Sequence, residues 1–183
     1  MICLCTILVL LLNSENDSSE IEKSRLKFLF EKPSKEELKT YIGDEESNQS
    51  NTIQAYRGLS MTLMAEHVFS PFSKLSYFYE GRDLIDQSIE EKPNNPELRY
   101  IRLIVQLNAP GFLGYNESIA EDLDLFVTMF DQTSLPAGQM VKNMLNAKHI
   151  EDYEIWKFLS RISNETFNRG SNFFLFHQNL VEP

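Results

Sequence analysis

Two amphipathic patterns lie on either side of a short polar break in the middle of the chain. Apolar residues recur every three or four positions on both sides of it, which is the spacing of one face of an α-helix. The apolar face before the break contains Leu75, Phe78, Ile85 and Ile89. The face after the break contains Leu98, Ile101 and Ile104 or Val105. We therefore expect one helix to end, and another to begin, at the break.

The break, Lys92-Pro93-Asn94-Asn95-Pro96-Glu97, contains residues that end and begin helices. Pro93 lacks an N–H and disfavours helix at the residue before it. Asn95 is a good N-cap, and Pro96 would stand at the first helical position, where proline is well tolerated. The sequence thus predicts a turn at Pro93 and a new helix from Pro96.

An earlier helix is predicted from residues that recur along one of its sides. They are Ala55, Gly58, Thr62, Ala65 and Phe69. Four of these five side chains are small, which lets a neighbouring backbone come close. We expect two antiparallel helices joined by a short turn, followed by a third helix.

Two capping boxes and two further periodic segments extend the helical pattern. Ser34-x-x-Glu37 opens a short helix through Tyr41, and Ser118-x-x-Glu121 opens another. The apolar face of this last helix contains Ile119, Leu123, Phe126, Val127 and Phe130. A helix over residues 22–31 would turn inward Leu26, Leu29 and Phe30. A helix beginning at Leu135-Pro136 would turn inward Met140, Val141, Met144 and Leu145.

A last helix is predicted over residues 151–162. No segment shows the sustained alternation of a half-buried strand. The sequence therefore predicts an all-α fold.

The stretch Tyr56-Arg57-Gly58-Leu59, then Ala65, then the break at the end of the second helix, resembles a tetratricopeptide repeat (TPR). The likeness covers about one and a half units, over residues 53–107. Val68 to Ser73 departs from it, because a repeat turn is tighter and the unit becomes longer than about 34 residues. The resemblance implies antiparallel hairpins stacked as a short right-handed array with a concave, partner-binding face.

The segment from Ser70 to Phe78, together with Phe112-Leu113-Gly114-Tyr115, is similar to an uncharacterised family of small helical envelope proteins in bacteria. This likeness implies no activity. We expect four parts in the chain. They are an apolar segment and linker at 1–20, short helices and an acidic loop at 21–50, a TPR-like domain at 51–165 and a tail at 166–183.

Composition and charge narrow the classes of function. A hydrophobic content of 42% is typical of a globular protein. The net charge of −10 leaves no basic stripe to neutralise phosphates, so we expect no nucleic-acid partner. The two cysteines, Cys3 and Cys5, lie in the first few residues, so the remainder has neither a disulfide framework nor a thiolate metal site.

Residues Ile2 to Leu12 form an apolar run as long as the core of a signal peptide and far short of the ~20 residues that span a bilayer. No Lys or Arg precedes the run, and no small-x-small cleavage site is evident after it. We expect an export signal, and a protein of the periplasm or cell envelope that contacts a membrane only through this segment, if it stays uncleaved. The alternative is a disordered or docked N-terminus on a cytoplasmic protein.

The residues that carry catalytic or metal chemistry are scattered. His67, His149 and His177 lie on different predicted elements, without the i, i+4 spacing of helical zinc ligands. The seven glycines occur singly, so the chain has no glycine-rich phosphate loop. Acidic pairs such as Asp122 and Asp124 are typical of solvated helix faces. The sequence predicts no catalytic residue, no metal and no cofactor.

Two features are candidates for binding a partner. Arg99, Arg102 and Gln106 lie at i, i+3 and i+7 of the third helix, opposite its apolar side, where two arginines would clamp a carboxylate. Alternatively, these arginines pair with nearby acids such as Asp83 or Asp86 and hold the helices together.

The second candidate is the loop Pro110 to Tyr115. Its Phe112 and Tyr115 form either a binding lip or part of the core. The chain as a whole is best interpreted as a non-enzymatic protein- or peptide-binding module or scaffold. The alternative is a small-ligand-binding protein or enzyme with a pocket between helices, anchored by Arg99, Arg102 and Tyr115.

Overall fold

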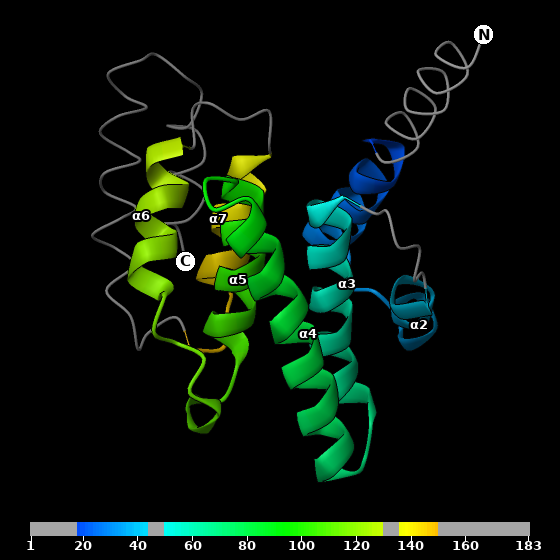
Figure 1. Cartoon of the computed structure of the whole chain (residues 1–183). Helices are drawn as coiled ribbons and strands as arrows, with labels where there is room; N and C mark the ends of the chain where they lie inside the picture. The colour runs from blue at the N-terminus through cyan, green and yellow to red at the C-terminus, as the bar shows by residue number, and fades with distance from the viewer. Residues whose placement is uncertain (1–17, 44–49, 130–135, 150–183) are drawn as a thin grey trace, which may run out of the picture. The chain divides into compact units, whose positions relative to one another are not determined.

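The computed structural model describes residues 18–43, 50–129 and 136–149 (Figure 1). Every regular element in these ranges is a helix, which confirms the all-α fold class. The contacts divide the chain into two compact units, with the division between Pro93 and Asn94. This division falls within the segment 51–165, and the boundaries expected at residues 20, 50 and 165 stay predictions. The segment Ile2–Leu12, the helix expected over 151–162 and the tail from 166 lie outside the described residues.

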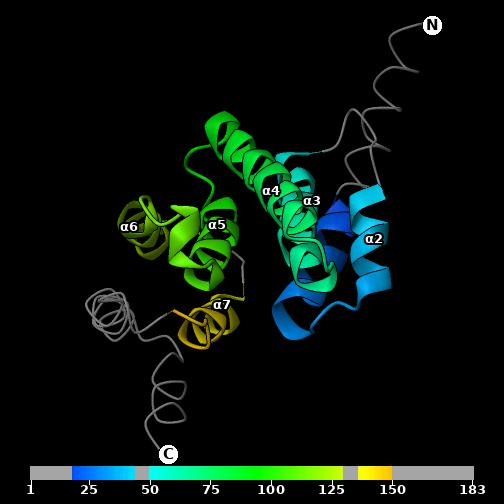
Figure 2. The ribbon, with the colours of Figure 1, turned by 90° about the horizontal axis from the view of Figure 1, so that it is seen from below.

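The first unit is built around a helical hairpin. Its elements are a helix over residues 18–30, α2 (Lys35–Gly43), α3 (Asn51–Met64), the 3₁₀ turn η1 (Ala65–His67) and α4 (Pro71–Glu91). Helix α3 packs against both α2 and α4, and α3 and α4 lie side by side in both views (Figures 1 and 2). The Asn51 amide donates a 2.7 Å hydrogen bond to the Glu91 carboxylate, which joins the start of α3 to the end of α4.

Two glycines set how closely the hairpin packs. A Cβ placed on Gly58 of α3 would lie 2.5 Å from the Gly81 carbonyl oxygen, and one on Gly81 of α4 would lie 2.5 Å from the Gly58 carbonyl oxygen. Real Cβ atoms essentially never come that close to another atom. The close backbone approach expected from the small residues of α3 is therefore present, and only glycine fits on both sides of it.

The helix over residues 18–30 is oriented by an aromatic cluster. The ring of Phe28 lies 5.0 Å from that of Tyr41 and 5.4 Å from that of Tyr56, centroid to centroid. Leu29 is buried as expected, but Leu26 and Phe30 are exposed, so their inward placement is wrong. They lie on the opposite side of the helix because Phe28 fixes which face turns toward α2 and α3.

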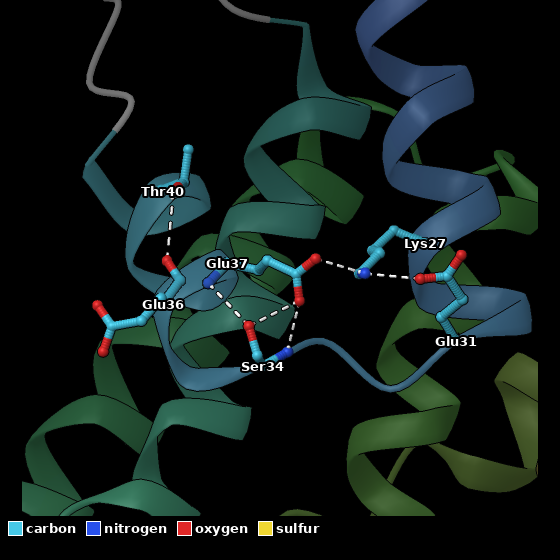
Figure 3. A network of polar contacts seen from close by, with 6 residues as sticks. All are labelled: Lys27, Glu31, Ser34, Glu36, Glu37 and Thr40. Carbon is cyan, nitrogen blue, oxygen red and sulfur yellow. Dashed lines mark hydrogen bonds and ion pairs between the residues drawn. The ribbon is translucent and has the colours of Figure 1, made fainter.

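The first capping box forms as the sequence predicts (Figure 3). The Ser34 N–H and hydroxyl each donate to one Glu37 carboxylate oxygen at 2.7 Å, and the Glu37 N–H donates back to Ser34 Oγ at 3.3 Å. The Lys27 ammonium lies 2.5 Å from the other Glu37 oxygen. The Lys27 contact, with the bonds from Ser34, lowers the pKa of Glu37 to about 2. The ion pair between Lys27 and Glu37 links α2 to the preceding helix and requires Glu37 to be ionised.

We expect the variant Glu37→Gln to be less stable than wild type above about pH 4.5, with a difference that narrows as the pH falls toward 2. The ionised carboxylate favours the folded state because its pKa is lower there than in the unfolded chain. Thermal unfolding by circular dichroism between pH 2 and 7 measures this. The control Glu36→Gln removes a neighbouring exposed acid outside the box. A Glu37→Gln deficit that is the same at every pH would contradict the assignment.

The second unit contains α5 (Pro96–Asn108), the 3₁₀ turn η2 (Gly111–Leu113), α6 (Ile119–Met129) and α7 (Ala137–Leu145). Asn95 caps α5 by accepting a hydrogen bond from the Glu97 N–H at 2.9 Å, and Pro96 occupies the first turn, which confirms the expected start. Helix α5 contacts both α6 and α7.

The core of the second unit follows the apolar faces read from the sequence. Its buried residues include Leu98, Ile101, Val105, Ile119, Leu123, Phe126, Val127, Met140, Val141 and Met144. Phe130 lies outside the described residues. The Asn143 amide of α7 donates to the Tyr100 hydroxyl of α5 at 3.1 Å, and burial raises the pKa of Tyr100. This bond supplies a polar link between α5 and α7.

Candidate interaction surface

Three charged side chains that are largely shielded from solvent join α5 to α6. Arg102 binds Asp122 in bidentate fashion, with its Nε 2.7 Å from Oδ2 and its Nη2 2.7 Å from Oδ1. Arg99 Nη1 donates to the same Oδ1 at 2.8 Å and to Glu121 Oε1 at 2.9 Å. The Asp122 side chain is 0% exposed, so this carboxylate is held by two guanidinium groups away from water.

This cluster corrects two expectations from the sequence. Arg99 and Gln106 are buried and Arg102 is nearly so, although all three were expected on the polar side of the helix. The acids that hold the arginines are Asp122 and Glu121, and Asp122 is not part of a solvated face. The physical reason is that α6 and α7 both pack on α5, which leaves little of its polar side exposed. The Gln106 amide oxygen has no hydrogen-bond partner within the described ranges.

The loop after α5 presents one aromatic residue rather than two. Phe112 is 84% exposed, whereas Tyr115 is only partly exposed and makes further contacts. Gly114, at φ +64°, closes the 3₁₀ turn in the left-handed region that glycine tolerates. Phe112 therefore fits the interpretation of the loop as a lip, and Tyr115 fits that interpretation less well.

The largest apolar exposure among the described residues lies at the connected end of the α3–α4 hairpin. We call this surface the tip patch; it consists of Phe69 (100% exposed), Phe72 (86%), Leu75 (36%) and Tyr79 (38%). Phe69 lies in the connection before α4, and the other three recur at i, i+3 and i+7 on one face of α4. The connected end of the hairpin lies at the bottom of Figure 1.

The sequence pattern had placed Phe69 and Leu75 on inward faces, and both placements are wrong. Helix α3 ends at Met64, so Phe69 does not continue its face. The inward face of α4 is fixed by Gly81 and the buried Ile85, and Leu75 lies away from it. The pair Ser70-Pro71, an N-cap followed by proline at the first helical position, is the signal that would have located this new helix start.

The tip patch is comparable in area with the largest apolar patch of a typical monomeric protein. If a fully exposed aromatic side chain contributes ~200 Å², the four exposed fractions amount to roughly 500 Å². The largest apolar patch on a typical monomer is ~300–600 Å² and is often functional. Phe69 and Phe72 contribute little to the core of the described unit, so this surface is a candidate binding site.

The side chain of Arg82 contacts the tip patch through Tyr79. Its guanidinium carbon lies 5.0 Å from the centre of the Tyr79 ring, within cation–π range. Its Nη2 lies 2.7 Å from Asp83 Oδ1. Arg82 thus connects the apolar start of α4 to its more acidic end.

The described part of the chain has no group of three or more His, Cys, Asp or Glu placed to hold a metal ion. Among those same residues, no helix is long and apolar enough to cross a bilayer. No protein-family model matches the chain, and comparisons with curated proteins and with solved structures find no significant match. The tip patch and the arrangement of charges are therefore the observations on which a function can be argued.

Proposed function

We propose that this protein is a non-enzymatic binding module that engages a protein or peptide through the tip patch. The observation that carries the proposal is the exposure of two phenylalanines at the end of a rigid hairpin. Aromatic residues that a partner can bury contribute much of the binding energy at protein interfaces. Phe69 and Phe72 cost free energy in water and stabilise nothing inside the unit.

The close packing of α3 against α4 favours a preorganised tip patch. Helices α3 and α4 meet backbone to backbone at Gly58 and Gly81, which leaves little room for one to slide past the other. A preorganised patch binds without the entropy cost of ordering a loop. The same features support a TPR-like hairpin, in which small residues pack the first helix and a proline follows the second.

A small-ligand or enzymatic role remains the alternative from the sequence, and its motivation is weaker on this structure. Two of its three polar anchors, Arg99 and Arg102, are engaged by a buried carboxylate of their own unit. Export to the cell envelope rests on the segment Ile2–Leu12, which lies outside the described residues, and stays a prediction.

We expect the double variant Phe69→Ser, Phe72→Ser to fold as wild type does. Its affinity for the cellular protein partner, and with it the recovery of that partner, should fall at least tenfold. Removal of two fully buried aromatic contacts from an interface costs well over the 1.4 kcal/mol that corresponds to tenfold in affinity. Affinity purification with quantitative mass spectrometry, from the native cells, measures partner recovery; circular dichroism measures folding.

The matched control is Phe30→Ser, which removes another exposed phenylalanine of the first unit, outside the tip patch. A partner recovered equally with the tip variant and with wild type would contradict the proposal. So would the absence of any partner whose recovery depends on the tip patch.

A further inference from the structure

One face of α4 continues the tip patch along the whole helix. Residues at i, i+3, i+7, i+11, i+14 and i+18 share a single face of an α-helix. On α4 this face, which we call the α4 stripe, consists of Phe72, Leu75, Tyr79, Asp83, Asp86 and Glu90. All six are exposed or partly exposed. The stripe is apolar in its first half and acidic in its second half.

The apolar half alone is smaller than a stable interface. Specific complexes bury ~800 Å² on each partner, and the tip patch offers roughly 500 Å². A partner seated on Phe72 and Tyr79 must therefore cover neighbouring surface as well. The stripe spans 19 residues, or about 27 Å of helix at ~1.5 Å per residue, which matches the footprint of a helix laid alongside α4.

The acidic half of the stripe lies at the C-terminal end of α4, where negatively charged side chains are unfavourable. The C-terminal end of a helix carries partial negative charge, which favours basic side chains nearby. The last turn of α4 contains no basic residue and ends in Glu90-Glu91. From Glu80 to Lys92 the chain has five acidic side chains against two basic ones. A basic partner would interact favourably with these carboxylates and with the helix end together.

The basic residues of this segment are fewer than its carboxylates. Arg82 is engaged by Asp83 and by the Tyr79 ring at the junction of the two halves, and Lys92 follows the helix. These two basic residues against five carboxylates leave residues 80–92 with a net charge of −3. Asn51 binds Glu91 as a neutral amide and leaves its charge in place. The end of α4 keeps a net negative charge next to an exposed apolar surface.

From this arrangement we propose that the α4 stripe docks an amphipathic helix of another protein, with apolar residues at one end of its binding face and Lys or Arg at the other. The inference rests on the proposed function and names the chemistry of its partner. The apolar end covers the tip patch, and the basic end lies against Asp86 and Glu90. Charge complementarity along the helix sets the register in which the partner binds.

A displayed library of 21-residue helical peptides tests the proposal. The peptides are randomised at the six positions of one helical face and selected on the full-length protein. We expect the selected peptides to carry Leu or Phe at one end of that face and Lys or Arg at the other. Their binding should weaken roughly three- to tenfold on the variant Asp86→Asn, Glu90→Gln, and more steeply with added salt for wild type than for the variant.

The control variant Glu31→Gln, Glu36→Gln removes two exposed acids elsewhere in the first unit and should bind the peptides as wild type does. One outcome would overturn the inference and leave the proposed function standing. In it, the selected peptides have no basic residues, and they bind the variant Asp86→Asn, Glu90→Gln as well as wild type but do not bind Phe69→Ser, Phe72→Ser. Binding to phosphatidylcholine vesicles with no selected peptide would overturn both. Self-association through the stripe, seen by sedimentation, would also overturn the inference.

Discussion

The variant Gly81→Ala is expected to lower the free energy of unfolding by about 2–3 kcal/mol, because the added methyl group meets backbone that cannot move aside alone. Its Cβ would lie 2.5 Å from the Gly58 carbonyl oxygen and 2.9 Å from Thr62 Cγ2. The better helix propensity of alanine, worth ~1 kcal/mol, offsets only part of this cost. Urea unfolding followed by circular dichroism measures the change.

The matched control is Gly43→Ala, at the end of α2, where an added Cβ has nothing within 4 Å. It should be neutral or slightly stabilising. Gly58→Ala should resemble Gly81→Ala, and the double variant should cost less than the sum, since both methyl groups force apart the same contact. A Gly81→Ala protein as stable as wild type would show that the helices do not meet there.

The variant Asp122→Asn is expected to lower the free energy of unfolding by about 3 kcal/mol, since it leaves two guanidinium groups without their buried counter-charge. Arg99 and Arg102 both depend on this carboxylate, at 2.7–2.8 Å. The amide conserves the shape of the side chain, so a loss of stability reports on charge rather than on packing. Thermal and urea unfolding measure it.

Asp124→Asn is the control, two residues further on the same helix and exposed. We expect it to change stability by less than about 0.5 kcal/mol. Combining Asp122→Asn with Arg102→Gln should cost less than the two single changes added together, because each removes the same interaction. Equal effects of Asp122→Asn and Asp124→Asn would contradict the role given to Asp122.

Much of the fold was predictable because its signals are local. The capping box at Ser34 and Glu37, and the turn from Pro93 to Pro96, act within a few residues of themselves. Their geometry depends on backbone conformation and capping bonds, not on distant parts of the chain. The same holds for the small side chains of α3, whose pattern predicted a close neighbour.

The candidate site was less predictable because exposure depends on what packs against each helix. Arg99 and Arg102 have the spacing of a polar surface. Asp122 of α6, which follows α5 and η2 in the chain, binds both and removes them from water. Leu75 has the spacing of a core residue, but it is exposed because the face of α4 that contains Gly81 packs against α3 instead. In both cases a long-range contact decided which side of an amphipathic helix meets water.

The sequence by itself determined that the described residues form helices and where most of them begin. It did so because helix caps, prolines and apolar periodicity are properties of neighbouring residues. Only the tertiary structure decided that Asp122 is a buried counter-ion and that Phe69 and Phe72 face solvent. Burial is a property of the packed unit, and the same spacing can serve a core, an ion pair or a docking surface.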